Sequence, residues 1–250
     1  MNAFGAAAPR IRPPPARGGA LAPVFAPILA PALALVLGLA LVVAGFPRFM
    51  AALYAVSAND ATRQLDASDP GLGPAELLAA RQGLRYALAW EGDGATAVRL
   101  ARVTLALAAR EYRAGGNPLP LVEETIEAAR RGLAAAPAQA RGWLLLAEAM
   151  LARTGDPGAV VPFLLEAIRA SPHDIWMAPH RAELGLRAWP WLEPQARALV
   201  SEQIRLSALR RVDGVVAMAR RAGDPGPVRE ALAADAERLR QFDVLYLQHR

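Results

Sequence analysis

The sequence predicts an all-α protein with one N-terminal transmembrane helix followed by a stack of helix–turn–helix units. Three observations predict this class. The chain is rich in Ala, Leu, Arg and Glu, which favour helix, whereas Val, Ile and aromatic residues are too dispersed to build many strands. Residues 21–46 form an uncharged apolar run. Clusters of Gly and Pro divide the remainder into segments of helical length.

Residues 21–46 are predicted to cross a membrane as one helix. A helix rises about 1.5 Å per residue, so roughly 20 residues span a hydrocarbon core about 30 Å thick. Pro23, Pro27 and Pro31 fall in the first half, and we expect the regular helix to begin near Pro27 or Pro31. A buried core helix is disfavoured because the run is apolar on every face. The alternative is a cleaved signal peptide with a site at Val56-Ser57-Ala58, although signal cores are shorter.

The charge distribution gives this span a direction. Residues 1–20, interpreted as a disordered tail rich in Pro and Gly, contain three arginines and no acid. The positive-inside rule places this tail in the cytoplasm and residues 47–250 outside, in the periplasm of a Gram-negative cell, with the span in the inner membrane. Four of the 28 basic residues and none of the 23 acids lie in residues 1–50, so residues 51–250 carry a formal charge of +1. This near-neutral remainder argues against nucleic-acid binding despite the high isoelectric point of the chain.

The remainder of the chain is predicted to hold a membrane-proximal helix or linker at residues 47–74 and a helical domain at residues 75–250. Segments of about 12–20 residues there show apolar stripes with the helical period. The tetrapeptide Gly-Asp-Pro-Gly at residues 155–158 recurs at residues 223–226, which is an offset of 68. This offset is twice a period of about 34 residues that is typical of helical repeats. Residues 213–250 are predicted to cap the stack, with five apolar side chains inward: Leu232, Leu239, Phe242, Leu245 and Tyr246.

The segment Trp143–Pro172 is similar to one tetratricopeptide repeat. The positions of that family are matched in order by Trp143, Leu146, Ala147, Met150, Phe163, Ala167 and Pro172. Ala147 replaces the usual Gly, Met150 replaces the usual Tyr, and the pattern slips by one residue after the turn. Val122–Pro137 resembles the second helix of a preceding repeat, and Trp90 stands where an earlier unit would close. The resemblance covers about residues 75–190, is clearest at residues 121–172, and implies a concave face that binds proteins.

We find no catalytic set in the sequence. The absence of Cys excludes disulfides, thiolate metal sites and cysteine nucleophiles. There is no phosphate-binding glycine loop and no nucleophile elbow. Glu123, Glu124 and Glu127 are spaced to pair with Arg130 and Arg131 along one helix, which suits ion pairs better than acid–base chemistry. We therefore expect neither enzyme activity nor a cofactor.

Four side chains are candidates for partner binding: Trp176, Trp189, Trp191 and His180. Core packing is the alternative role for the tryptophans. Residues 171–194 resemble the C-terminal part of tetratricopeptide-like membrane proteins of bacterial envelope polysaccharide or secretion systems. The sequence thus predicts a membrane-tethered scaffold or adaptor for a protein partner in the cell envelope.

The alternative function is a metal-dependent envelope enzyme, or an accessory subunit of one, that uses the region His173–Glu183. Its candidate ligands are His173, Asp174, His180 and Glu183. His180 and Glu183 are three residues apart and can share a helix face. Asp174 follows Pro172 at a position that favours a helix cap instead. The sequence does not fix the oligomeric state.

Overall fold

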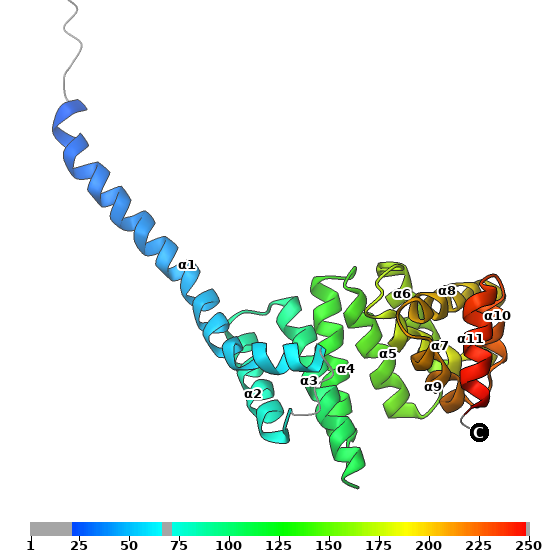
Figure 1. Cartoon of the computed structure of the whole chain (residues 1–250). Coiled ribbons are helices and arrows are strands. Elements are labelled where there is room, and N and C mark those ends of the chain that lie inside the picture. The colour runs from blue at the N-terminus through cyan, green and yellow to red at the C-terminus, as the bar shows by residue number, and fades with distance from the viewer. Residues whose placement is uncertain (1–21, 67–71, 249–250) are drawn as a thin grey trace, which may run out of the picture. The chain divides into compact units, whose positions relative to one another are not determined.

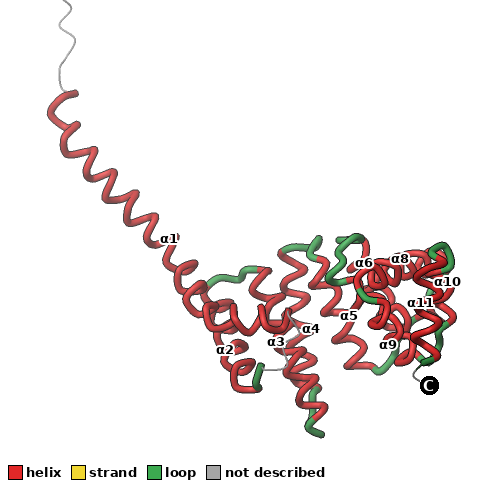
Figure 2. The backbone as a smooth tube through the Cα atoms, viewed as in Figure 1, coloured by secondary structure: helices red, strands yellow, loops and turns green. Residues whose placement is uncertain are grey.

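The structure is a computed structural model that describes residues 22–66 and 72–248. All regular secondary structure in these two ranges is helical, which confirms the predicted all-α class (Figure 2). The chain divides into two compact units, Met1–Phe46 and Pro47–Arg250, and the second unit is called the body below. The tail predicted for residues 1–20 lies outside the described residues.

The first helix, α1 (Ala22–Asp66), is 45 residues long. Its stretch Pro31–Val56 is long and apolar enough to cross a membrane, and the side chains there are largely exposed. The helix begins before Pro27 and continues through Phe46, so the regular part is longer at both ends than the sequence predicted. Beyond Phe46 it has a different role, since Ala58 and Ala61 are buried in the body. The alternative cleavage site at residues 56–58 lies inside this helix.

Helices α2 to α5 lie one after another in the body, and α6 to α11 gather beyond α5 (Figure 1). Its N-terminal half holds α2 (Pro74–Trp90), α3 (Gly94–Arg113), α4 (Leu119–Ala135) and α5 (Ala140–Thr154). Its C-terminal half holds η1 (Gly158–Val160), α6 (Val161–Ala170), α7 (Ala178–Arg187), η2 (Trp189–Trp191), α8 (Pro194–Arg210), α9 (Val212–Ala222), α10 (Gly226–Leu232) and α11 (Ala236–Leu247). Consecutive helices are in contact from α2 to α7, and α7 packs against both α8 and α9.

The two Gly-Asp-Pro-Gly segments fold in the same way. Gly155 ends α5 and Gly223 ends α9 with left-handed φ values of 68° and 78°, which glycine adopts without a Cβ clash. The Asp156 and Asp224 carboxylates each accept a hydrogen bond of 2.8 Å from the amide two residues on. The motif therefore makes the same turn twice, between α5 and η1 and between α9 and α10.

Helix α5 joins two hydrophobic cores. Leu146 and Ala149 are buried in the core formed with the end of α1 and with α2 to α4. Leu144 and Ala147 are buried in the core formed with α6 to α11, and Trp143 contacts both. Because one helix is buried on two sides, the body has no polar boundary between its halves. At the far end, Phe242 of α11 is fully buried, as the sequence pattern predicted.

Candidate binding groove

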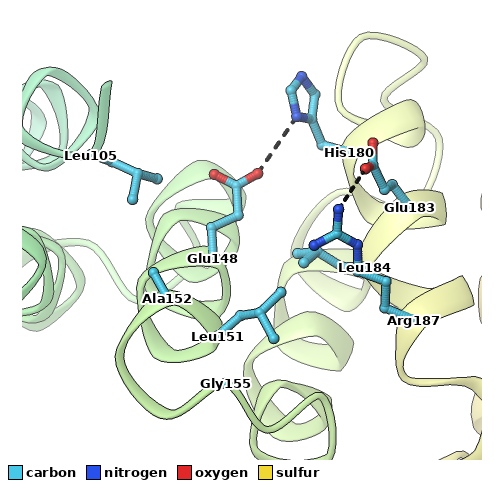
Figure 3. Close-up of a pocket in the computed structure, with 9 residues that line it drawn as sticks. All are labelled: Leu105, Glu148, Leu151, Ala152, Gly155, His180, Glu183, Leu184 and Arg187. Atoms are coloured by element: carbon cyan, nitrogen blue, oxygen red, sulfur yellow. Dashed lines mark hydrogen bonds and ion pairs between the residues drawn. The ribbon is translucent and has the colours of Figure 1, made fainter. Parts of the chain in front are cut away.

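The first part of the candidate site is a cavity of about 590 Å³ between α3, α5 and α7. Leu105 of α3, Leu151 of α5 and Leu184 of α7 supply its apolar lining, as Figure 3 shows. These three helices are the alternate helices of the body, and α4 and α6 connect them. The cavity thus depends on the regular alternation of helices and not on one local loop.

A row of charged side chains crosses this cavity from α5 to α9. His180 Nδ1 lies 3.5 Å from Glu148 Oε1, and Figure 3 shows the two side chains pointing toward each other. Glu183 accepts hydrogen bonds of 3.0 and 2.9 Å from the Nε and Nη2 atoms of Arg221, and one of 3.1 Å from Arg187. The fork of Arg221 is bidentate, a geometry that fixes orientation as well as charge. The His180–Glu148 pair thus connects α7 with α5, and the Glu183–Arg221 pair connects α7 with α9.

The contacts in this row shift two pKa values in opposite directions. The hydrogen bond to Glu148 raises the pKa of His180 above its usual value, and the nearby charge of Glu183 adds to this effect. Burial alone would raise the pKa of Glu183. The guanidinium of Arg221 outweighs that effect and lowers the pKa, so Glu183 is ionised at neutral pH.

A second cavity of about 530 Å³ continues the first and shares Leu151, Gly155 and Arg187 with it. The further lining residues are Pro157, Leu186, Trp189, Pro190, Trp191, Arg221, Ala222, Asp224 and Pro227. The Trp-Pro-Trp turn η2 therefore shares this cavity with both Gly-Asp-Pro-Gly turns. A Cβ on Gly158 would lie 2.9 Å from Trp191 Cδ1, so the glycine lets the indole pack closely. We call the two cavities together the groove.

Three of the four predicted binding residues, His180, Trp189 and Trp191, line the groove. Trp176 does not. Its side chain is 69% exposed and lies under the guanidinium of Arg210, 4.1 Å from the ring centre, away from the groove lining.

The predicted metal candidates do not come together. His173 is exposed, and the carboxylate of Asp174 accepts hydrogen bonds from the amides of Trp176 and Met177 just before α7. His180 and Glu183 turn to separate partners, Glu148 and Arg221. Within residues 22–66 and 72–248 there is no group of three or more His, Cys, Asp or Glu side chains placed to hold a metal ion.

Sequence reasoning missed Glu148, Arg221 and Leu105. Each lies on a helix far from the Trp-rich segment in sequence. Helical periodicity places Leu105 on an apolar stripe, but it does not indicate that this residue or the other two meet the Trp-rich segment. The lining of the groove contains no Ser, Thr, Tyr, Lys or Cys, so none of these nucleophiles lies beside the His180–Glu148 pair. Its leucines, prolines, indoles and paired charges are suited to non-covalent contact with another chain.

Comparison of the chain with protein-family models, with curated proteins and with solved structures gives no match. The described residues define an all-α protein with one N-terminal helix apolar enough to cross a membrane. Its body carries a groove across alternate helices.

Proposed function

We propose that the chain is a membrane-tethered scaffold or adaptor of the tetratricopeptide type, which binds a segment of a protein partner in its groove. The observation that carries this proposal is the continuity of the groove. It crosses α3, α5 and α7 and runs on past the Trp-Pro-Trp turn to the end of α9, so a bound segment would contact four helices of the body at once. Stacked helix pairs use such faces to bind extended partners.

The chemistry of the groove suits a peptide. Apolar side chains, among them Leu105 and Trp191, alternate with charges that are already paired, such as Glu183 with Arg221. A partner therefore gains contact area from the indoles and leucines and does not have to leave an unpaired buried charge. The arginines Arg187 and Arg221 share one carboxylate, which leaves donors for a partner's carbonyl or carboxylate oxygens.

The tether and its direction follow from α1 and from the charges that flank it. The apolar part of α1 that ends at Phe46 supplies the membrane span, and the arginine-rich N-terminal residues hold that end in the cytoplasm. The body then lies in the periplasm, on the outer side of the inner membrane. The resemblance of residues 171–194 to envelope proteins favours a role in a polysaccharide or secretion assembly.

Site-specific photocrosslinking tests the proposed site. A photoreactive phenylalanine analogue replaces Leu105 or Trp191 in the full-length protein, in cells. Tyr112 is the control, because it lies on the same helix as Leu105, is 73% exposed and is not part of the groove lining. We expect one adduct of the same size from both groove positions and none from Tyr112.

A blocking variant makes the test specific. Leu105→Glu places a charge on the apolar lining of the first cavity and should abolish the adduct formed from Trp191, in the second. Tyr112→Glu, the matched control, should leave that adduct unchanged. The proposal would be wrong if the groove positions gave no adduct, or if Leu105→Glu and Tyr112→Glu acted alike.

A further inference from the structure

The first cavity of the groove contains an ion pair whose charge depends on pH. His180 Nδ1 of α7 lies 3.5 Å from Glu148 Oε1 of α5, and both residues line the cavity. Figure 3 shows the two side chains reaching toward each other from the two helices. The groove continues from Leu105 of α3 to Trp191 beyond α7. A segment that fills it therefore passes over this pair.

His180 is the member of the charged row that changes its charge near neutral pH. Arg187 and Arg221 stay protonated, and Glu183 stays ionised because its pKa is lowered. The imidazole of His180 is 64% exposed, whereas the side chain of Glu148 is 26% exposed. The imidazole can therefore exchange protons with solvent in the free protein, and a bound segment would cover it.

The charges that act on His180 lie on α3, α5 and α7. The hydrogen bond and the charge of Glu148 on α5 raise its pKa, and the charge of Glu183 on α7 adds to the rise. Partial burial and the charge of Arg102 on α3 oppose this rise without cancelling it. The buried Arg181 faces α8 and is not part of the cavity lining. The pair is thus set to gain a proton as the pH falls toward the acidic range.

A segment bound in the groove removes water from this pair. When the imidazole is protonated, Glu148 is covered together with a charged partner, and the pair has no net charge. When the imidazole is neutral, the same carboxylate is covered with one counter-charge fewer. A charge is much more costly to bury alone than in a pair, so covering these groups favours uptake of a proton. Uptake of that proton by Glu148 itself would act in the same direction.

We propose that the groove binds its partner segment more tightly at acidic than at alkaline pH, and that the His180–Glu148 pair between α5 and α7 senses the pH. This inference rests on the proposed function, because it concerns the regulation of the same groove. A partly exposed ion pair changes an equilibrium only modestly, so we expect an affinity change of about two- to fivefold. Binding would therefore respond to pH in a graded way.

Photocrosslinking from Trp191 measures this response, because Trp191 lines the second cavity and not the first. Cells that carry the full-length protein are irradiated at about pH 5.5 and about pH 8, on either side of the usual pKa of histidine. A permeant weak acid and a permeant weak base bring every compartment to the pH of the medium. We expect about two- to fivefold more adduct at the acidic pH.

Three variants assign the response to the pair. His180→Gln and Glu148→Gln keep polar side chains of similar size but cannot form the ion pair, so the adduct yield should no longer depend on pH. His173→Gln is the matched control, because His173 is exposed and is not part of the groove lining. It should keep the response of the parent. Each variant is compared with itself at the two pH values, and its melting curve verifies that it is folded.

The outcomes separate this inference from the proposed function. An adduct formed equally at both pH values in the parent would overturn the pH response and leave binding in the groove intact. A response that persists in His180→Gln and Glu148→Gln would show that another group titrates, and would equally overturn the inference. Absence of any adduct at either pH would overturn the proposed function, and the inference with it.

Discussion

Arg181 provides the sharpest prediction about stability, because its guanidinium is fully buried. Its Nη1 atom donates a hydrogen bond of 2.7 Å to the carbonyl of Ser171, which ends α6, and lies 3.4 Å from Gln203 Oε1. Gln203 in turn donates to the carbonyl of Pro172. Burial lowers the pKa of this guanidinium. The charge is costly to bury, and the turn between α6 and α7 depends on it.

Two substitutions separate the hydrogen bonds from the packing. Arg181→Met keeps most of the side-chain volume and leaves the Ser171 carbonyl unpaired. A hydrogen bond from a charged donor contributes about 1.5–3 kcal/mol to stability. Removing the buried charge offsets part of that lost contribution, so we expect the unfolding free energy to fall by about 2 kcal/mol. Arg181→Ala also creates a cavity, which adds about 2 kcal/mol or more. The expected loss for the alanine variant is therefore about 4 kcal/mol.

Thermal unfolding of the full-length protein in detergent, followed by circular dichroism at the helix band, measures both losses. For about 200 residues, 1 kcal/mol corresponds to a shift of about 2–4 °C in Tm. Arg181→Met should melt about 4–8 °C below the parent and Arg181→Ala about 8–16 °C below it. A methionine variant as stable as the parent would show that Arg181 does not stabilise the turn, because the cost of burying its charge would then cancel its hydrogen bonds.

Three further predictions use the same melting assay. A Cβ on Gly185 would lie 2.3 Å from Val200 Cγ1, so Gly185→Ala should lower the unfolding free energy by about 1–3 kcal/mol. Gly92→Ala is the control and should leave Tm unchanged, because a Cβ there has no atom within 4 Å. Equal shifts in Tm would contradict the packing of α7 on α8. The carboxylate of Asp93 caps α3 through two backbone amides, so Asp93→Ala should cost about 1 kcal/mol, and no loss would exclude the cap. Because the pKa of His180 is raised, its ion pair with Glu148 stabilises the fold below about pH 6.5, and this stabilisation is lost as the pH rises through the raised pKa. His180→Gln should remove this pH dependence of the unfolding free energy, which we expect to be less than about 1 kcal/mol. A pH profile of Tm that the variant leaves unchanged would exclude the ion pair.

Much of the fold could be predicted because local chemistry sets where helices begin and end. Pro74 and Pro194 start α2 and α8, and Gly155 and Gly223 end α5 and α9 with left-handed turns. The end of the first helix could not be predicted in this way. The uncharged run stops at Phe46, before Arg48, but the helix continues to Asp66 because Ala58 and Ala61 pack into the core of the body.

The groove was less predictable because its residues meet across helices. Glu127 pairs with Arg131 along α4, as the spacing predicted. Glu123 instead pairs with Arg153 of α5, a partner that no spacing rule on one helix could supply. The contacts of Glu148 and Arg221 with α7 are of the same kind. A row of ion pairs between alternate helices depends on how the pairs stack, and a single sequence does not give that stacking.

We propose that one helix holds the body at the outer face of a membrane, and cysteine labelling in spheroplasts of a Gram-negative host tests this proposal. Cells carry the full-length variant Tyr112→Cys in the body or Ala3→Cys near the N-terminus, and a membrane-impermeant maleimide is added before or after lysis. We expect the chain to stay in the membrane pellet after alkaline extraction. Tyr112→Cys should be labelled in intact spheroplasts, and Ala3→Cys only after lysis. Release of the chain into the supernatant, or labelling in the reverse order, would contradict it.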